Sequence, residues 1–300
     1  MAFSSNVRNI ERAVEEARDA GGRYLLTPEL SICGYGCEDH FFESDTETHC
    51  WEALAKLASA QAGASKGFLL DVGMPVYHGG SRYNCRVIVG NGEVLGIRPK
   101  TVMADDGNYR EGRWFTAWPA DKLEIDSFLL PPSYTEGFSL TDRQRTAPFG
   151  LMSFLSVDGL KMSVETCEEL WSPRSPNVDA SLSGVDVIAN GSGSHHELRK
   201  LQRRLELVVE ATKRSGGIYL YSNQVRVCVR EEGGYGGGLT ASLHLTNIHH
   251  TASIAKRSGA ATVGGCISMA PASLCATGKS SSREVSSASR TWRFARLRST

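Results

Sequence analysis

The stretch Ser163-Val164-Glu165-Thr166-Cys167-Glu168-Glu169-Leu170-Trp171 decides how this chain folds and what chemistry it can carry. A β-compatible run over 161–166 ends in a lone cysteine, and two carboxylates and a tryptophan follow. This order predicts a strand, a sharp turn and the start of a helix. A thiol at such a turn projects from the end of a strand, where helix amides can lower its pKa. A buried core cysteine is the commoner case for the residue type alone, so the rest of the chain has to decide.

The bulk composition points to a globular α/β protein. The 300 residues suffice for one large α/β domain or two small ones. The eight cysteines are scattered and form no CxxC pair, which argues against a disulfide framework or a zinc ribbon. The first residues lack the pattern of a secretory signal, and no apolar run is long enough to span a membrane. We therefore expect a cytoplasmic protein without a membrane partner.

Charge divides the chain into two parts. The formal net charge is zero, but residues 225–300 carry ten Lys or Arg and only three Asp or Glu. Past residue 224 glycines and serines cluster and no apolar period is sustained, which predicts a mostly irregular basic tail. The tail has no alternation of aromatic and basic residues, so nucleic-acid binding is not expected.

Residues 1–224 alternate between helical and strand patterns, which is typical of an α/β domain. Apolar periodicity predicts that the helix 197–214 turns Leu198, Leu201, Leu205 and Val208 inward. The polar and aromatic segment 101–120 is expected to form an ordered loop across a site. The predicted helices cover 6–20, 51–62 and 197–214, and the predicted strands cover 24–26, 68–74, 86–89, 93–97, 151–155, 160–166, 185–189 and 218–222.

Three chemically useful side chains each follow a predicted strand. Glu29 and Lys100 come directly after a strand and a proline, and Cys167 comes directly after a strand. Strand ends can converge at one edge of a sheet, where α/β proteins usually bind ligands. There the carboxylate could take the thiol proton, the thiolate could attack a carbonyl or nitrile carbon, and the ammonium could stabilise the oxyanion. Taken singly, Glu29 is as well explained as a turn carboxylate and Lys100 as a solvated cation.

Several blocks of the sequence, in order, resemble the nitrilase superfamily, and more narrowly the glutaminase domain of eukaryotic glutamine-dependent NAD synthetases. The resemblance runs from about residue 6 to Gln224 and implies a four-layer α-β-β-α sandwich. The blocks are Pro28-Glu29-Leu30, Cys33-Gly34-Tyr35, Asp71–Val76, Tyr83–Arg86, Arg98-Pro99-Lys100, Gly107–Glu111, Glu165–Trp171 and Asn190–His196.

The resemblance implies a catalytic triad of Glu29, Lys100 and Cys167 that hydrolyses the side-chain amide of glutamine. Cys167 would form a glutamyl thioester and release ammonia, and water would then release glutamate. Glu29 would act as base and then as acid, while Lys100 and the amide of Glu168 would hold the oxyanion. Glu111 could be an auxiliary carboxylate. The substrate-binding positions of the family match Tyr35, Tyr109, Glu168 and Ser194.

The resemblance also implies that the glutaminase chemistry needs no cofactor, that ATP and deamido-NAD belong to a synthetase domain, and that members form homo-oligomers. The residues themselves offer only weak metal candidates. Adjacent histidines such as His195 and His196 point in different directions on a helix and rarely share one ion. Cys33, Cys37 and His40 are three loosely spaced candidates without a fourth, so no metal site is expected.

The chain departs from the family at three places. The family's first core strand has no counterpart before the first helix, and after Gln224 its last strands are replaced by an unrelated sequence, so we expect an incomplete sandwich over 1–224. The Ser-Gly-Gly-x-Asp-Ser loop that grips pyrophosphate is not found. We therefore expect ammonia supply only. A stand-alone amidase acting on another small amide and an inactive truncated product remain as alternatives.

Overall fold

The first helix forms where apolar residues recur every three or four positions. In the computed structural model α1 spans Phe3–Asp19 and buries Val7, Ile10, Val14 and Ala17. Gly21 follows with φ 76°, a left-handed conformation that glycine adopts readily and that ends the helix. The structure describes residues 2–62, 67–136, 144–195, 197–213, 215–224, 253–255, 261–263 and 292–295.

The first sheet carries two of the three predicted site residues on its loops. Within the described residues it has six strands in the order β1-β2-β3-β4-β6-β5. The long hairpin of β2 and β3 pairs ten positions without a shift, while β1 pairs in parallel with β2 and lies at the edge. The strands are β1 (Tyr24–Leu26), β2 (Leu69–His78), β3 (Ser81–Gly90), β4 (Glu93–Pro99), β5 (Asp126–Leu129) and β6 (Thr146–Phe149).

The second sheet carries the predicted nucleophile. Among the described residues its order is β10-β9-β8-β7-β13, with β8, β9 and β10 parallel to one another. These strands are β7 (Ser153–Ser156), β8 (Lys161–Thr166), β9 (Val187–Ser192), β10 (Ile218–Asn223) and β13 (Trp292–Ala295), and a separate pair is formed by β11 (Ser253–Ala255) and β12 (Ala261–Val263).

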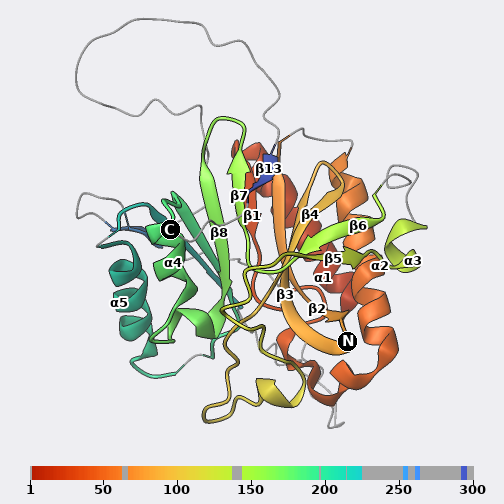
Figure 1. The fold of residues 1–300 in the computed structure, drawn as a ribbon, viewed down its shortest axis with the longest axis horizontal. Coiled ribbons are helices and arrows are strands. Elements are labelled where there is room, and N and C mark those ends of the chain that lie inside the picture. Colours follow the sequence, from red (N-terminus) through yellow and green to blue (C-terminus); the bar gives the residue numbers. More distant parts are fainter. Residues whose placement is uncertain are drawn as a thin grey trace, which may run out of the picture.

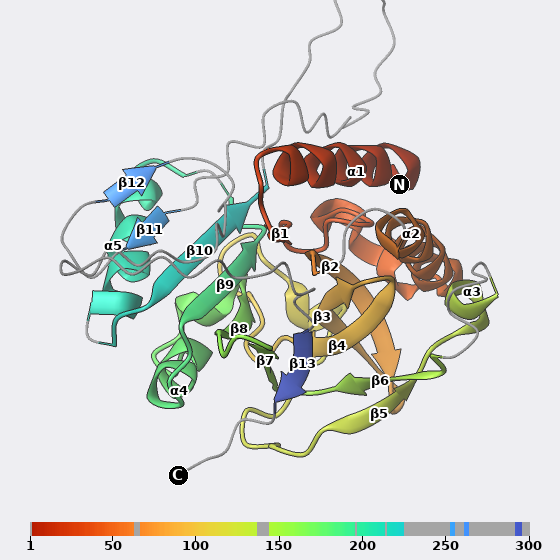
Figure 2. The ribbon, with the colours of Figure 1, turned by 90° about the horizontal axis from the view of Figure 1, so that it is seen from above.

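The layers follow the order helices, sheet, sheet, helices, as Figures 1 and 2 show from two directions. α1 and α2 cover the first sheet, and α4 and α5 cover the second. One buried cluster lies between α1, α2 and the first sheet, a second lies between the sheets, and a third lies between the second sheet and α5. This is the predicted α-β-β-α sandwich. The remaining helices are α2 (Ser44–Ala62), α3 (Pro132–Thr135), α4 (Pro176–Leu182) and α5 (Lys200–Lys213).

One predicted helix face is wrong. Leu198 is 93% exposed and Leu201 is 55% exposed, whereas Val208 is buried as expected. The helix starts later than predicted because Arg199 has a left-handed φ of 66° and α5 begins only at Lys200. Leu198 therefore lies in the turn before the helix.

The tail also differs from the prediction at three short places. β11, β12 and β13 lie within the predicted irregular region 225–300, and β13 pairs antiparallel with β7 as the end strand of the second sheet. The rest of this region lies outside the described residues, and the domain boundary at residue 224 stays a prediction. None of the helices in the described part of the chain is long and apolar enough to cross a membrane.

Candidate active site

The structure places Glu29 and Lys100 in direct contact. Glu29 lies in the turn after β1, and Lys100 follows the last residue of β4. Lys100 Nζ lies 2.7 Å from Glu29 Oε1, and both side chains are completely buried. Buried charges are retained only where they are paired and hydrogen-bonded. The pair therefore accounts for two charges that solvent cannot reach.

Glu111 joins this pair from the segment 101–120. Its Oε2 atom lies 2.6 Å from Lys100 Nζ and accepts a hydrogen bond of 2.7 Å from the Ala104 amide. Asn84 Nδ2 donates to both carboxylates, at 2.8 Å to Glu29 Oε1 and 2.6 Å to Glu111 Oε1. Two carboxylates thus share one ammonium and one amide group, in keeping with the predicted auxiliary carboxylate.

The electrostatics of this cluster favour a charged lysine. Burial alone lowers the pKa of Lys100, but the adjacent Glu111 and Glu29 more than offset it and raise that pKa well above its usual value. Burial, with the negative charge of Glu29, raises the pKa of Glu111 to about 7, although Lys100 opposes this. The cluster holds a permanent cation and a carboxyl that can carry a proton near neutral pH.

Cys167 stands at the junction of β8 and a 3₁₀ helix over Cys167–Leu170, as the sequence predicted. Its φ is 40°, a left-handed conformation that is rare for a residue other than glycine and is often found at functional sites. The Cys167 amide donates to Asn190 Oδ1 at 3.0 Å, which holds this conformation from β9. The turn therefore fixes the direction of the thiol.

The thiol is buried and feels both charges of the cluster. Burial is the largest cause that raises the pKa of Cys167, and the charge of Glu29 adds to it. Lys100 and a hydrogen bond from Ser192 act in the opposite direction. The resting group is therefore a neutral thiol, and a nucleophilic sulfur requires a base that takes its proton as it reacts.

A carboxylate clamp joins the turn of Cys167 to the loop of Lys100. Glu169 forms a buried ion pair with Arg98 and accepts hydrogen bonds from the Thr101 amide at 2.7 Å and the Thr166 amide at 2.5 Å. The donors flank Lys100 on the first sheet and Cys167 on the second. The clamp thus sets the position of one sheet's site residues relative to the other's.

The structure describes the surroundings of the four predicted substrate-binding residues. The rings of Tyr35 and Tyr109 meet edge to face at 6.4 Å. Ser194 is buried and its Oγ accepts a hydrogen bond of 3.0 Å from Arg204. Glu168 is half-buried, and burial raises its pKa while Lys100 lowers it. The charges of Glu29 and Glu111 act on Tyr35 and that of Lys100 acts on Glu168, so these two residues lie beside the charged cluster.

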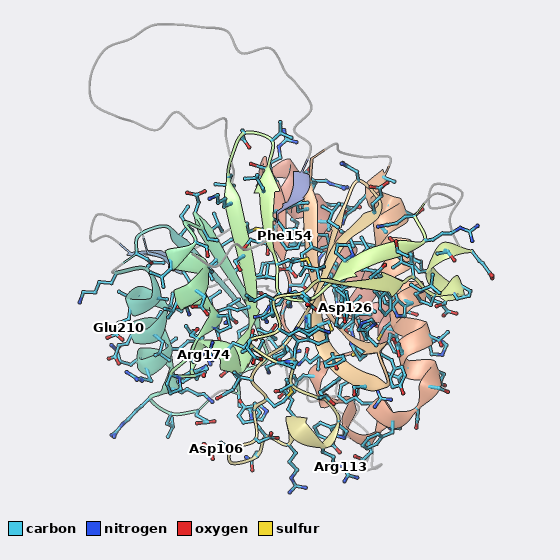
Figure 3. All side chains as sticks on the ribbon, viewed as in Figure 1. Asp106, Arg113, Asp126, Phe154, Arg174 and Glu210 are labelled. Atoms are coloured by element: carbon cyan, nitrogen blue, oxygen red, sulfur yellow. The ribbon has the colours of Figure 1, made fainter. Side chains whose placement is uncertain are left out.

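The segment 101–120 crosses the site as an ordered loop. Figure 3 labels Asp106 and Arg113, which mark its course along the lower edge of both sheets. Arg113 pairs with Asp39 at 2.7 Å, and the charge of Asp106 acts on Glu168. The segment is mostly loop, as predicted, with a short 3₁₀ helix over Glu111–Arg113.

Sequence reasoning gave no role to several residues that the structure brings to the site. Asn84, Asn190 and Ser192 lie in segments that carry the family resemblance, but their partners lie far away in the chain. Lys200, at the start of α5, places its ammonium 5.4 Å from the centre of the Tyr109 ring and 5.6 Å from that of Trp171. Residue type and spacing do not reveal such contacts.

Among the residues that the structure describes, the weak metal candidates do not assemble into a metal site. The His195 ring stacks on Tyr109 at 4.3 Å, and His196 lies outside the described residues. His40 contacts Glu43 at 2.8 Å, while Cys33 and Cys37 are buried. Across the described ranges no group of three or more His, Cys, Asp or Glu could hold a metal ion.

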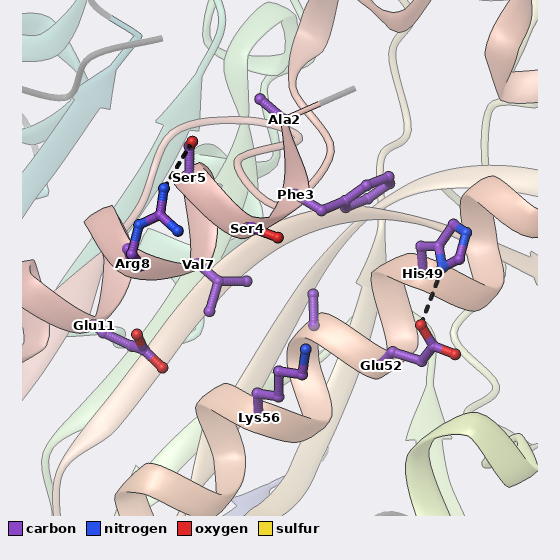
Figure 4. A pocket seen from close by; sticks show the side chains of 11 residues that line it. Ala2, Phe3, Ser4, Ser5, Val7, Arg8, Glu11, His49, Glu52 and Lys56 are labelled. Atoms are coloured by element: carbon purple, nitrogen blue, oxygen red, sulfur yellow. Dashed lines mark hydrogen bonds and ion pairs between the residues drawn. The ribbon is translucent and has the colours of Figure 1, made fainter. Parts of the chain in front are cut away.

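A pocket of about 550 Å³ lies elsewhere, between the first turns of α1 and the neighbouring part of α2 (Figure 4). Its polar lining includes Arg8, Glu11, His49, Glu52 and Lys56. None of the predicted site residues lines it, so this pocket is separate from the candidate active site.

Comparison with known sequences gives a consistent picture. The family model described as carbon-nitrogen hydrolase matches residues 1–266. The glutamine-dependent NAD(+) synthetase of Dictyostelium discoideum is 48% identical over 224 residues, which cover 75% of this chain and 30% of that protein. The human protein of the same name is 46% identical over 222 residues, which cover 74% of this chain and 30% of that protein. The chain thus spans about a third of the length of these relatives.

Solved structures agree on the fold. A glutamine-dependent NAD(+) synthetase from Cytophaga hutchinsonii superposes with a TM-score of 0.63 at 31% identity, covering 76% of this chain and 34% of that one. An amidase of the nitrilase superfamily from Nesterenkonia superposes with a TM-score of 0.53 at 17% identity, covering 74% of this chain and 71% of that one. With the family model matching most of its length, this chain belongs to the carbon-nitrogen hydrolase family.

Proposed function

We propose that this chain hydrolyses the side-chain amide of glutamine and thereby supplies ammonia for NAD biosynthesis. The names of the most similar relatives support glutamine as the substrate. The observation that supports this proposal most directly is the buried contact between Lys100 and Glu29, beside the turn that presents Cys167. Because the chain spans about a third of those relatives, NAD formation itself is assigned to a synthetase domain that uses ATP and deamido-NAD.

The first half of the proposed reaction forms a thioester. Glu29 takes the proton of the Cys167 thiol while the sulfur attacks the amide carbon of glutamine, forming a C–S bond and an oxyanion. The ammonium of Lys100 and the amide of Glu168 stabilise that oxyanion. The intermediate collapses as the C–N bond breaks, Glu29 returns the proton to the leaving nitrogen, and ammonia departs.

The second half returns the enzyme to its starting state. Glu29 takes a proton from water while the water oxygen attacks the thioester carbon, and Lys100 again faces the oxyanion. The C–S bond breaks, the sulfur regains a proton, and glutamate leaves. Both halves use only side chains, backbone amides and water, so the proposal includes no cofactor or metal.

Burial suits the proposed roles. The paired carboxylates keep Lys100 charged, so it can stabilise an oxyanion without first gaining a proton. The raised pKa of Cys167 keeps the resting sulfur protonated, so the proton transfer to Glu29 accompanies attack on the substrate. We assign substrate contact to Tyr35, Tyr109, Glu168 and Ser194.

The wider setting follows from the family. We place the chain in the cytoplasm as a homo-oligomer, with glutamine as its small-molecule ligand and no nucleic-acid or membrane partner. Size-exclusion chromatography with light scattering measures the assembly state directly.

Ammonia release tests the proposal. Purified chain is incubated with glutamine, asparagine and a series of simple ω-amides, with Cys167→Ala as the matched control. We expect release from glutamine that exceeds release from the other amides and is lost in the variant. Equal release from all amides would contradict a preference for glutamine and indicate a broader amidase. Release from none of them would mean that the chain is inactive.

A further inference from the structure

One hydroxyl touches the sulfur of Cys167 and has no part in the reaction described above. Ser192 ends β9, is completely buried, and places Oγ 3.2 Å from Cys167 Sγ. Tyr221 on β10 places its phenol oxygen 2.7 Å from the same Oγ atom. The three groups form a line of hydrogen bonds from the second sheet to the reactive sulfur.

The donor and acceptor roles in this line can be assigned. A serine hydroxyl has one hydrogen to donate and two lone pairs to accept with. Within the described residues, Ser192 Oγ is the hydrogen-bond partner found for the Tyr221 phenol, so the phenol donates to it. The Ser194 amide, which donates to Asn223 at 2.9 Å, also lies 3.3 Å from Ser192 Oγ. The one hydrogen of Ser192 therefore points to Cys167 Sγ.

The environment keeps Tyr221 in its donor form. Burial is the largest cause that raises the pKa of the Tyr221 phenol, and it outweighs the charge of Arg204, which lowers that pKa, so the phenol stays protonated. The guanidinium of Arg204 lies 5.5 Å from the ring centre. The protonated phenol donates to Ser192 Oγ and thereby orients the Ser192 hydroxyl.

A hydroxyl donor affects the thiolate more than the thiol. Neutral sulfur is a weak acceptor, whereas hydrogen bonds to a charged acceptor are roughly twice as strong as neutral ones. The bond from Ser192 therefore strengthens as the proton moves from Cys167 to Glu29, and it favours the charged sulfur that attacks. Ser192 keeps its own proton during this step.

We infer that Ser192 is a further catalytic residue, which stabilises the Cys167 thiolate through a hydrogen bond, and that Tyr221 is a positioning residue for it. The inference rests on the proposed function only in taking Cys167 as the nucleophile, and it does not depend on which amide is the substrate.

Alkylation of Cys167 by iodoacetamide over a range of pH values tests this, because the reaction reports thiolate content and needs no glutamine. Mass spectrometry of the peptide that contains Cys167 separates it from the other cysteines. For Ser192→Ala we expect alkylation at a fixed pH below the thiol pKa to be about tenfold slower, with the profile moved to higher pH by about one unit. For Tyr221→Phe we expect a shift of the same sign and about a third of the rate effect.

Ser222→Ala is the matched control, because Ser222 is also a buried serine of this sheet but its hydroxyl has no hydrogen-bond partner among the residues that the structure describes. Its profile should equal that of the unmodified chain. A Ser192→Ala profile that also equals it would overturn the proposal. If Ser192→Ala does not fold, as judged by circular dichroism, Tyr221→Phe decides, and an unchanged profile there rejects the line of hydrogen bonds. A chain that shows these shifts but releases no ammonia from glutamine disproves the proposed substrate and leaves the role of Ser192 standing.

Discussion

Two buried ion clusters take their cations from the same segment, Arg98 in one and Lys100 in the other, and they differ in charge balance. In the clamp, Glu169 faces one guanidinium, that of Arg98, and its oxygens also accept hydrogen bonds from two backbone amides. In the site cluster, Glu29 and Glu111 face the single ammonium of Lys100. Burial is nearly complete in both clusters. A balanced pair holds the fold in place, while an excess carboxylate leaves a group that can accept a proton.

Removing the proposed nucleophile should have the largest effect on the site cluster's function. Cys167→Ala should lower the rate of ammonia release at least about 10⁴-fold, since loss of the nucleophile in a comparable triad removes most catalysis. The thermal midpoint should change little because the substitution leaves both ion clusters intact. An ammonia assay and circular dichroism melting measure the two quantities. Residual activity near the original rate would mean that another group attacks the amide.

Replacing the proposed base probes one of the two carboxylates that share Lys100. Glu29→Gln should reduce the rate of ammonia release by about 10²–10⁴-fold, the range typical for loss of general acid–base catalysis. The glutamine side chain has one acceptor oxygen, so it can keep the hydrogen bond from Asn84 but loses the one that the Gly193 amide donates to the other carboxylate oxygen, and circular dichroism checks that the variant folds. The pH profile of the rate distinguishes the roles, and an unchanged profile with an unchanged rate would contradict the assignment of Glu29.

Breaking the clamp should affect stability first. Arg98→Met leaves Glu169 buried without its cation, which typically costs about 3–5 kcal/mol of the free energy of unfolding. Urea unfolding followed by tryptophan fluorescence measures this loss. Arg12→Met is the matched control, because it breaks an exposed ion pair with Glu16 on α1. If both substitutions change stability equally, the clamp has no special structural role.

The smallest expected effect concerns Glu111 and pH. Its pKa is raised from an ordinary value near 4.5 to about 7, so the folded chain binds this proton more tightly than the unfolded chain. The contribution to stability is complete below about pH 4.5 and is lost as the pH rises through 7. The thermal midpoint of the Glu111→Gln variant should therefore fall less between pH 5 and 7.5 than that of the unsubstituted chain. Glu16→Gln, on the surface of α1, serves as the control.

Strand ends and turns could be predicted from the sequence because their signals are local. The strand over 24–26, the two strands on either side of Asn91-Gly92 and the turn at Cys167 form where apolar runs meet turn residues. The predicted triad follows from the same signals together with the family resemblance, and the structure brings Glu29 and Lys100 into contact.

Other features could not be predicted because their causes are distant in the chain. β5 and β6 lack a clear alternating pattern and form because β6 pairs with β4. The roles of Asn190 and Ser192 arise only when β9 lies beside β8, some 25 residues away. The exposed Leu201 shows the limit of periodicity, since an apolar residue at helical spacing need not face the core.

The clamp of Glu169 also affects how this protein would lose activity as it is destabilised. Glu29 and Lys100 come from the first sheet and Cys167 from the second, so the reacting groups meet only at the seam between them. Each sheet has its own helices and its own buried cluster on its outer side. A slip of one sheet along the other would leave both outer cores packed while separating the reacting groups. Activity therefore measures the alignment of the two halves, and it should disappear at a lower urea concentration than the helical signal.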